Sequence, residues 1–311
     1  MSRFLKKLTF LFIFPLLLFF ACLEVMLRNI PNDYSFKRKW LDTNAKQIKL
    51  LVLGSSTGYY GVNPNFLSGK AFNAAHVYQN PKYDLFILEK FISSFDSLQY
   101  IILPVTYHSF FYSLETSEEN WRTKNYYIHY GMKGNRFDPK LNLAFYDHSL
   151  LSILKRTFRY YIKGQDEINC NAPGFGTSYL LERRLPNWEG EGEIKAKVHS
   201  ALFNQEDYSE NLMMLERMAG LCKERRIKLI MVFAPAWDTY IEHIDTELLK
   251  LDLLKCEEIS RKYGNVSFVN MLNDRRFTND DFYDVNHLNE FGSKKFTLAI
   301  DSIMNSYPLT D

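Results

Sequence analysis

The chain has 311 residues and a mass of 36.7 kDa, which is enough for one large α/β domain or for two domains of average size. Its formal net charge is only +2 and it contains no long basic block, so the composition does not indicate a nucleic-acid-binding protein. With 46% hydrophobic and 24% charged residues the chain is neither disordered nor fibrous. The mean hydropathy of −0.26 excludes a polytopic membrane protein.

The first expected element is a hydrophobic segment near the N-terminus. Three cationic residues precede it, namely Arg3, Lys6 and Lys7. The apolar run that follows covers residues 8–23, which is shorter than the ~20 residues needed to cross a bilayer. If Glu24 lies at the membrane surface, continuation to Leu27 brings the segment to spanning length. We therefore predict an uncleaved membrane anchor over residues 1–29.

The same segment has two other interpretations. A cationic start followed by an apolar stretch is also typical of a cleaved secretory signal, and residues 19–22 resemble a lipoprotein signal in which Phe replaces the usual Leu. Positive charges also follow the segment, at Arg28 and residues 37–39, so the positive-inside count is close to balanced. Because the start resembles an export signal, we expect the body outside the cytoplasm, in the periplasm or at the cell surface.

The cysteines do not settle the compartment. They are Cys22, Cys170, Cys222 and Cys256. One lies in the hydrophobic segment and two fall within helical patterns, so we interpret them as small apolar residues and not as a disulfide framework.

Beyond residue 48, apolar runs of strand length alternate with helical patterns. The expected strands cover residues 49–53, 100–105, 228–233 and 266–269. The expected helices cover residues 81–95, 208–226, 247–263 and 290–305. Almost continuously apolar strands that alternate with helices predict an α/β fold, with a parallel sheet covered by helices on both faces. In such sheets the chemistry collects at the C-terminal ends of the strands.

The segment from residue 108 to residue 201 interrupts this alternation. It is rich in Tyr, Asn, Gly and Arg, and it shows one clear helical stretch, at residues 149–163. We interpret it as a cap inserted over the strand ends of a body that covers residues 30–311. Its tyrosines would suit a carbohydrate surface or an interface with a membrane partner: Tyr126, Tyr127, Tyr130, Tyr160 and Tyr161.

A first candidate for chemistry is the turn after the strand at residues 49–53. The sequence Gly54-Ser55-Ser56-Thr57-Gly58 places a hydroxyl at the end of a strand, beside the first amides of the next element. Such amides can stabilise a developing oxyanion in acyl transfer. The turn is not a phosphate-binding loop, because no Lys-Ser/Thr pair closes it. The alternative is a turn that is simply small and polar.

A second candidate lies just before the last expected helix. Asp284 and His287 are three residues apart, a spacing that lets the carboxylate accept a hydrogen bond from one imidazole nitrogen. The other nitrogen is then free to take a proton from a hydroxyl. The alternative is a helix-capping aspartate next to a surface histidine.

Together, the two segments resemble the first and last sequence blocks of the SGNH/GDSL hydrolase family. In that family the nucleophilic serine follows the first strand, and an Asp-x-x-His motif precedes the last helix. Ser56 stands at the nucleophile position, with Ser55 in place of the usual Asp, and Asp284 and His287 form the last block. The continuation over residues 288–292 looks like that of membrane-anchored members, which include the D-alanyl-transfer protein of teichoic acid modification and the alginate acetylation proteins.

The resemblance covers residues 48–106 and 205–305 in organisation, although the matching motifs are short. It implies a flavodoxin-like three-layer sandwich with a catalytic triad of Ser56, His287 and Asp284. It implies no cofactor.

The middle sequence blocks depart from the family's pattern. Asn73 and Ala75 stand where an Asn and a Gly whose amide joins the oxyanion hole are usual, so together with Ser56 they are the oxyanion candidates. The third block normally supplies an Asn after the next strand, and this chain has none there. Thr106 and His108 are substitutes for it, as is Asn73.

Residues that follow strand ends are candidates for substrate binding. They are Tyr107, His108 and Trp237. The other histidines show no metal-ligand spacing and the cysteines are too dispersed for a zinc site, so we expect no metal.

The leading hypothesis is a membrane-anchored serine esterase or O-acyltransferase that acts on a cell-envelope glycan. A membrane-bound O-acyltransferase is the partner that the resemblance implies. A non-catalytic module that binds glycan or scaffolds an envelope-assembly complex is the alternative, because the third block is incomplete. An intracellular lipase-like hydrolase is a third interpretation.

Overall fold

The computed structural model describes residues 9–146 and 149–306. The chain forms two compact units: unit 1 consists of residues 1–38 and 121–168, and unit 2 of residues 39–120 and 169–311. The domain boundaries expected from the sequence, at residue 29 and at residues 108–201, rest on composition and remain predictions.

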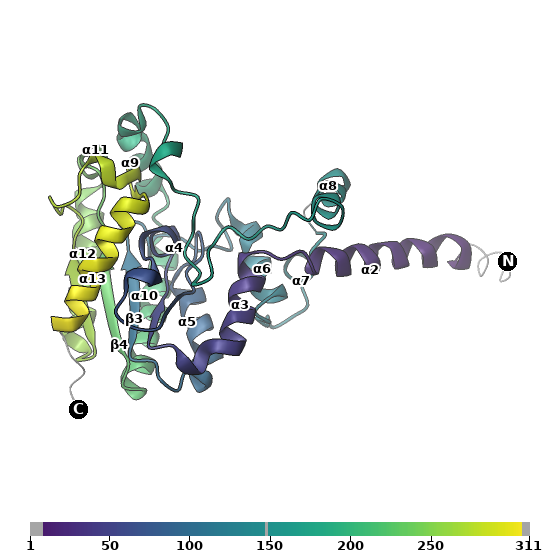
Figure 1. The fold of residues 1–311 in the computed structure, drawn as a ribbon, viewed down its shortest axis with the longest axis horizontal. Coiled ribbons are helices and arrows are strands. Elements are labelled where there is room, and N and C mark those ends of the chain that lie inside the picture. The colour runs from purple at the N-terminus through teal and green to yellow at the C-terminus, as the bar shows by residue number, and fades with distance from the viewer. Residues whose placement is uncertain (1–8, 147–148, 307–311) are drawn as a thin grey trace. The chain divides into compact units, whose positions relative to one another are not determined.

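Unit 2 is built on a five-stranded sheet (Figure 1). Its strands are β1 (Leu50–Val52), β2 (Ala71–Asn73), β3 (Tyr100–Val105), β4 (Lys228–Phe233) and β5 (Val266–Asn270). Every neighbouring pair is parallel, in the order β2-β1-β3-β4-β5. The predicted parallel α/β sheet is therefore confirmed.

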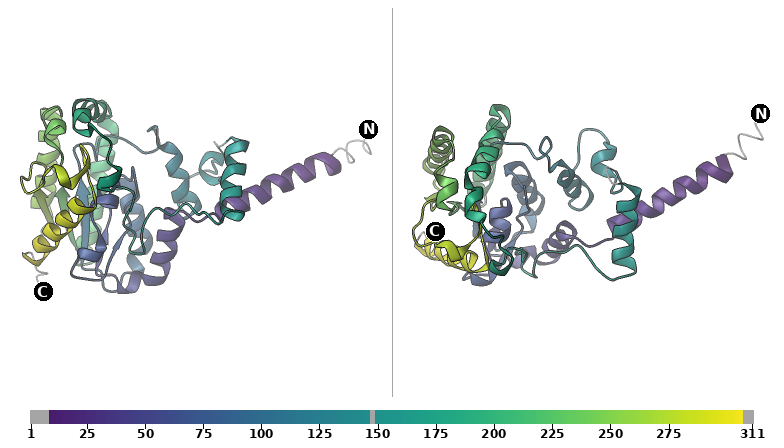
Figure 2. Two further views of the ribbon diagram at one scale, coloured as in Figure 1. Left: turned by 45° about the horizontal axis from the view of Figure 1, so that its top comes forward. Right: turned by 90° about the horizontal axis from the view of Figure 1, so that it is seen from above.

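Helices cover both faces of this sheet. The longer helices of unit 2 are α5 (Pro81–Phe91), α9 (Gly192–Ala201), α10 (Gln205–Glu224), α12 (Thr246–Lys262) and α13 (Glu290–Ser306), and the shorter ones are α4 (Ser56–Gly61) and α11 (Asp238–Ile241). Helix α5 packs against α10, whereas α4 packs against α13. Figure 2 shows α10 and α12 on one side of the sheet and α13 on the other. Crossover helices that alternate with parallel strands require this arrangement.

The strands β1, β3 and β4 form the core of unit 2 because they are almost continuously apolar. Leu51, Val52, Ile101 and Ile230 are fully buried. Burial of one such side chain contributes roughly 1.5–3 kcal/mol. The same continuity made these strands visible in the sequence, whereas the shortest elements were not predicted.

The elements that the sequence did not predict are short or polar. In unit 2 they include β2, α4, α9, α11, and a two-stranded antiparallel hairpin made of β6 (Phe282–Asp284) and β7 (His287–Leu288). Short 3₁₀ helices lie at Ala45–Gln47, Pro64–Phe66, Ile92–Ser94, Asn120–Arg122, Leu181–Arg183, Trp188–Glu191 and Asn279–Asp281.

Unit 1 is helical. A π-helical turn at Thr9–Ile13 leads into α2 (Phe14–Arg28), and α6 (Thr123–Ile128), α7 (Pro139–Asn142) and α8 (Leu150–Tyr161) follow later in the chain. Helix α3 (Asp33–Asn44) begins in unit 1 and ends in unit 2. Leu23, Leu27 and Ile30 form a small hydrophobic core with Ile153 of α8.

The N-terminal helix is long and apolar enough to cross a membrane. Residues Phe10–Arg28 form 19 helical residues with a mean hydropathy of 2.6, and most of this surface is not covered by the rest of the protein. By length and composition, the same helix fits a membrane anchor or a signal sequence. The cationic residues 3–7 lie outside the described residues.

Candidate active site

The turn after β1 presents Ser56 as the first residue of α4. Gly54, two residues before it, has φ = 102°, a backbone conformation that residues with a Cβ rarely adopt. A Cβ atom at Gly54 would also lie 3.0 Å from the backbone oxygen of Pro104 on β3. The turn therefore needs glycine at this position, and its close packing on β3 fixes where Ser56 lies.

The buried carboxyl group of Asp84 also fixes this turn, through a hydrogen bond to Gly54. The backbone N–H of Gly54 donates to Oδ1 of Asp84 on α5 at 2.7 Å, and Nε2 of Gln79 donates to the same oxygen at 2.6 Å. Burial raises the pKa of Asp84 to about 7, and these two hydrogen bonds offset part of that rise. Asp84 is thus a positioning residue for the serine turn, which the sequence analysis did not identify.

Ser56, His287 and Asp284 form one hydrogen-bonded series. Ser56 Oγ lies 2.8 Å from His287 Nε2. His287 Nδ1 lies 2.9 and 3.0 Å from the two carboxylate oxygens of Asp284. With Nδ1 protonated and donating to Asp284, Nε2 can accept the hydroxyl proton of Ser56.

The β6–β7 hairpin produces the spacing of the acid and the base. Asp284 and His287 are paired across the hairpin, and the intervening Asn286 donates its backbone N–H to Asp284 Oδ1 at 3.0 Å. Tight pairing across two intervening residues brings the carboxylate and the ring to the same side of the hairpin.

The residues after His287 fix the hairpin to α13. Oδ1 of Asn289 accepts from the backbone N–H groups of Phe291 and Gly292 at 2.9 and 3.0 Å, which caps the helix. A Cβ at Gly292 would lie 2.1 Å from the backbone oxygen of Asp281, so only glycine permits this close approach. The motif at residues 288–292 therefore has a structural role in placing His287.

The acid of the series is ionised. Burial opposes ionisation of Asp284, but the charge and the hydrogen bond of His287, together with the Asn286 amide, outweigh it and hold the pKa of Asp284 below its ordinary value. Little of either side chain is exposed, 17% for Asp284 and 11% for His287. A shielded carboxylate can stabilise the imidazolium that forms when His287 takes a proton.

Ser56 and His287 open into a cavity of about 130 Å³ in unit 2. The other residues that line it are Ser55, Val77, Tyr78, His108, Tyr112, Tyr179, Lys195, His199 and Asn286. Five of them belong to the parts of the predicted insertion that lie in unit 2: His108, Tyr112, Tyr179, Lys195 and His199. Lys195 is the one residue with a full charge among those that line the cavity, apart from the titratable histidines.

A stack of tyrosines flanks the base. Tyr179 stacks between Tyr60 and Tyr283, with ring centroids 3.7 and 4.1 Å apart, and it meets His287 edge-on at 5.2 Å. Tyr78 also lines the cavity, and its φ of 62° is unusual for a residue other than glycine. Strained backbone of this kind is typical of functional sites.

Two further histidines lie against each other at the cavity. The rings of His108 and His199 stack at 3.7 Å, and His199 Nδ1 lies 2.7 Å from the hydroxyl of Tyr240. Burial lowers the pKa of His108 to about 3, with further lowering by His287 and Lys195. Burial likewise lowers the pKa of His199, as do His108 and Lys195. Both rings are therefore neutral at neutral pH.

Two oxyanion candidates are already engaged in hydrogen bonds. The side chain of Asn73 is fully buried and donates to the backbone oxygens of Gly58 and Val62 at 2.8 Å. The backbone N–H of Ala75 donates to Asn73 Oδ1 at 3.0 Å. Neither residue lines the cavity, so an oxyanion role for either would first require breaking a hydrogen bond. Thr106, a suggested substitute, accepts from Ser109 or donates to it at 3.0 Å.

Of the three candidates for substrate binding, the structure places only His108 in the cavity. Tyr107 is buried, and its hydroxyl lies 2.9 Å from Ser200 Oγ and accepts from the backbone N–H of Asp245 at 3.0 Å. Trp237 packs against Trp188 and Phe282. Both residues follow strand ends as expected, but their side chains are packed against other residues and do not line the cavity.

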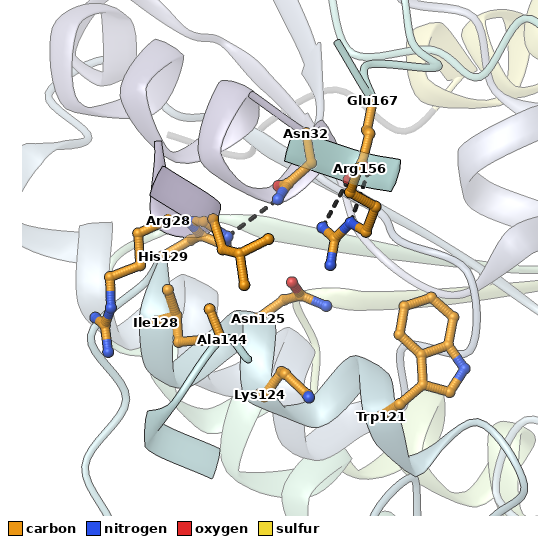
Figure 3. Close-up of a pocket in the computed structure, with 11 residues that line it drawn as sticks. Arg28, Asn32, Trp121, Lys124, Asn125, Ile128, His129, Ala144, Arg156 and Glu167 are labelled. Atoms are coloured by element: carbon orange, nitrogen blue, oxygen red, sulfur yellow. Dashed lines mark hydrogen bonds and ion pairs between the residues drawn. The ribbon is translucent and has the colours of Figure 1, made fainter. Parts of the chain in front are cut away.

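Unit 1 contains a second cavity, of about 260 Å³, near the end of α2 (Figure 3). Two of its cationic residues form ion pairs, Arg28 with Glu24 at 2.6 Å and Arg156 with Glu167 at 2.8 and 2.9 Å. The third, Lys124, donates to the backbone oxygen of Tyr146 at 2.6 Å. Asn32 lies 3.1 Å from Nε2 of His129. The cavity therefore shows internal ion pairs and no nucleophile next to a base.

The aromatic residues of the predicted cap divide between the two units. Tyr126 and Tyr130 are buried in unit 1 and pack against each other, and Tyr160 and Tyr161 lie at the end of α8. These tyrosines therefore belong to a different compact unit from Ser56. Within the described residues no group of three His, Cys, Asp or Glu side chains could hold a metal ion, and the cysteines are free.

No family model matches the chain, and no curated protein does. Among solved structures it is similar to a candidate platelet activating factor from Streptococcus pneumonia (10% identity, TM-score 0.43), with 87% of this chain and 90% of that chain covered. It is also similar to a candidate acylhydrolase from Bacteroides fragilis (11% identity, TM-score 0.42; 87% and 97% covered). A GDSL-like lipase from Bacteroides thetaiotaomicron has 12% identity and a TM-score of 0.41, with 88% and 99% covered.

Proposed function

We propose that this protein is a membrane-anchored serine esterase or O-acyltransferase of the SGNH type, which acts on an acyl ester of a cell-envelope glycan. The observation that carries the proposal is the hydrogen-bonded series from Ser56 through His287 to Asp284. Nucleophile, base and orienting acid are the three parts that covalent acyl transfer requires.

The reaction proceeds in two halves. Ser56 Oγ attacks the carbonyl carbon of the ester while its proton moves to His287 Nε2, and Asp284 stabilises the resulting imidazolium. The tetrahedral intermediate then collapses: the bond to the alcohol oxygen breaks, and that oxygen takes the proton from His287. Water or a sugar hydroxyl next attacks the acyl-serine, gives its proton to His287 and releases the acyl group as an acid or as a new ester.

The amide of Ser56 is the best oxyanion donor. As the first residue of α4, Ser56 has a backbone N–H without an acceptor inside the helix. This amide is adjacent to its own Oγ, so it can approach the oxygen of the attacked carbonyl. With Asn73 and Ala75 engaged elsewhere, we expect a weaker oxyanion site than one with several donors.

The size of the cavity favours a short acyl group. A cavity of about 130 Å³ is slightly smaller than the roughly 150 Å³ that accommodates a benzene molecule. An acetyl group fits such a volume, whereas a long fatty acyl chain does not. Lys195 adds a positive charge at the cavity, which favours a substrate with an anionic group next to the ester.

The apolar helix at Phe10–Arg28 supports the anchoring part of the proposal. An anchor would hold the active site near an acyl donor made at the membrane, which favours transfer to a sugar over simple hydrolysis. A membrane-bound O-acyltransferase is the natural partner for such a step, with the body of this protein on the extracytoplasmic side.

A non-catalytic glycan-binding or scaffold role is the second candidate. It is favoured by the engagement of Asn73 and Ala75 in hydrogen bonds, which leaves few donors for an oxyanion. A scaffold with the same fold would still bind glycan but would not form an acyl-serine.

A labelling experiment separates the two functions. The full chain, in detergent, is treated with a fluorophosphonate probe and assayed with p-nitrophenyl acetate. We expect labelling at Ser56 and turnover of the ester, both lost in Ser56→Ala and His287→Gln. In Ser55→Ala, which removes the neighbouring hydroxyl, the labelled peptide should still be the one with Ser56. A folded wild-type protein that neither labels nor turns over the ester would refute catalysis and leave the scaffold role.

A further inference from the structure

Helix α8 of unit 1 has three distinct faces. Its buried face consists of Ile153, Thr157 and Tyr160, which recur at the spacing of one helix face. Its exposed apolar face consists of Leu150, Leu151, Leu154, Phe158 and Tyr161, continued by Ile162. Its basic face consists of Lys155 and Arg159, and Lys163 follows two residues after the end of the helix. The apolar face lies between the buried face and the basic face.

The buried face fixes α8 to the end of α2. Ile153 packs in the hydrophobic core of Leu23, Leu27 and Ile30. The hydroxyl of Tyr161 donates to the backbone oxygen of Met26 at 3.0 Å. These contacts hold α8 in one rotational setting, so its apolar face is exposed by the fold and not by fraying.

An ion pair supports the same setting. Arg156 makes a bidentate contact with Glu167, at 2.9 Å through Nε and 2.8 Å through its terminal nitrogen, as Figure 3 shows. The backbone of Glu167 in turn pairs with Asn32, close to the end of α2. Arg156 is therefore a structural residue, whereas Lys155 and Lys163 are exposed and the exposed Arg159 lies at 4.0 Å from the same carboxylate.

The apolar face is too large to be an ordinary water-facing surface. Leu151 is 63% exposed, Leu154 45%, Phe158 51% and Ile162 70%. Contiguous apolar surface of this kind marks an interaction site on a soluble protein. The neighbouring part of α2 also exposes its apolar side chains, with Leu17 at 63% and Phe20 at 37%.

The charge beside the apolar face is of one sign. Residues 150–163 contain four Lys or Arg residues and no Asp or Glu. Apolar side chains on one face with Lys and Arg on the next are typical of helices that lie in the interface of a membrane, where long cationic side chains reach the headgroups. A second copy of the chain or a partner helix would require acidic residues opposite this row, or would leave it unpaired.

The direction of α8 also suits a membrane surface. The views in Figures 1 and 2 show α8 running across the axis of α2 instead of along it. If α2 crosses the bilayer, a helix that lies across its end runs along the membrane surface.

We propose that α8 lies in the interface of an anionic lipid membrane, with Leu151, Leu154 and Phe158 in the acyl-chain boundary and Lys155, Arg159 and Lys163 at the headgroups. The inference rests on the proposed membrane anchoring by α2 and adds a second membrane contact to it. Unit 1 would thus be seated on the bilayer by a spanning helix and a surface helix together.

Tryptophan substitutions in the full chain test this arrangement. The variants Phe158→Trp on α8, Leu17→Trp on α2 and Phe291→Trp on α13 of unit 2 each place an indole at an exposed apolar position. Each protein is reconstituted in phosphatidylcholine vesicles that contain phosphatidylglycerol, with or without bromine on the acyl chains. The added emission relative to wild type is then compared.

We expect brominated lipid to quench the added emission of Phe158→Trp and Leu17→Trp, and to leave that of Phe291→Trp unquenched. Quenching of Leu17→Trp without quenching of Phe158→Trp would overturn the placement of α8 while leaving the anchor intact. A blue-shifted but unquenched Phe158→Trp in a dimeric or partner-bound protein would assign this face to a protein contact instead. Absence of quenching in Leu17→Trp would show that α2 is not inserted in the membrane, and the placement of α8 at the membrane surface would fall with it.

The charges provide a separate readout. Replacing Lys155, Arg159 and Lys163 by Gln in the Phe158→Trp background should reduce its quenching in phosphatidylglycerol vesicles to the level seen in pure phosphatidylcholine. Equal quenching in the two lipids for both proteins would contradict the role of the basic face. Since none of the three side chains contributes to the core of unit 1, folding should be retained, which hydrogen exchange of the α8 amides can verify.

Discussion

The cavity of unit 1 near the end of α2 and the cavity around Ser56 in unit 2 differ in how their polar groups are used. In the cavity of unit 1, Arg28 and Arg156 are each paired with a carboxylate, so the charges stabilise the fold and are not free for a ligand. In the cavity of unit 2, Ser56 Oγ contacts Nε2 of His287, and Asp284 holds the other nitrogen of the same ring. A polar cavity is therefore not by itself a candidate active site. It becomes one when a nucleophile lies within hydrogen-bond distance of a base that can accept its proton.

The comparison predicts its largest effect for the nucleophile and the base. Ser56→Ala or His287→Gln should lower kcat for p-nitrophenyl acetate by at least about 10³-fold, since either change removes the whole nucleophilic unit. The two variants should be nearly equal, and the double variant no worse than either one. Steady-state rates of the single and double variants would test this, and additive losses would argue against a shared step.

The acid is expected to have the next largest effect. Asp284→Asn should lower kcat by about 10²–10⁴-fold, because an amide cannot stabilise the imidazolium and favours the wrong tautomer. The pKa of Asp284 is held below its ordinary value, so its ionic contribution to stability is present above about pH 4 and is lost as the pH falls through the folded pKa. Urea unfolding of wild type and variant over this range should show the difference shrinking in acid.

A smaller effect is expected for the carboxyl group under the serine turn. The pKa of Asp84 is raised from 3.8 to about 7, which is equivalent to about 4 kcal/mol at most. The folded state keeps this proton where the unfolded chain has released it, so wild type should lose stability relative to Asp84→Asn as the pH rises from about 4 to about 7. Urea unfolding of wild type and Asp84→Asn at pH 4 and pH 7 would show this change, and an equal difference in stability at the two pH values would contradict it.

The charge at the cavity should affect selectivity by about tenfold. Lys195→Gln should lower kcat/KM for an ester with a neighbouring carboxylate by about 10-fold, or about 1.4 kcal/mol, and leave a neutral acetyl ester nearly unchanged. Lys197→Gln, on the same helix but paired with Glu193, is the matched control. An equal loss for both esters would show that Lys195 supports the fold of α9 instead.

The smallest effect is expected in unit 1. Arg156→Met should weaken the attachment of α8 by about 1 kcal/mol, the value of a partly exposed ion pair. Hydrogen exchange of the α8 amides should accelerate accordingly, while hydrolysis of p-nitrophenyl acetate stays at the wild-type rate. Lys155→Met, on the exposed side of the same helix, should change the exchange less. A loss of hydrolysis in Arg156→Met would break the contrast between the two cavities.

The sequence predicted the parts of the fold that depend on a repeated local pattern. Strands β3 and β4 lie at the residues expected, because an unbroken apolar run bounded by polar residues has few other solutions. Strand β2 has only three residues and α4 contains two glycines, so neither presents a pattern long enough to be recognised. Ser56, Asp284 and His287 were predicted because their order along the chain resembles a known family's blocks.

The rest of the site depends on tertiary packing. Tyr179 and Lys195 reach the cavity from an irregular segment, and no periodicity indicates where such a segment folds back. Tyr107 and Trp237 show the opposite case: both follow strands, but the direction of a side chain after a strand end is set by what it packs against. The role of Asp84 could not be predicted, because a single carboxylate in a helical pattern normally faces solvent.

Helix α2 is packed rigidly against the rest of unit 1, without a flexible linker between them. Leu23 and Leu27 belong both to α2 and to the core of unit 1, and the carboxylate of Glu24 accepts from the backbone N–H groups of Ala144 and Phe145 at 2.8 to 3.2 Å. A protein on a flexible linker sweeps a volume set by the length of that linker. With α2 as an anchor, unit 1 has no such freedom: it moves together with α2 in the plane of the bilayer, at a fixed depth.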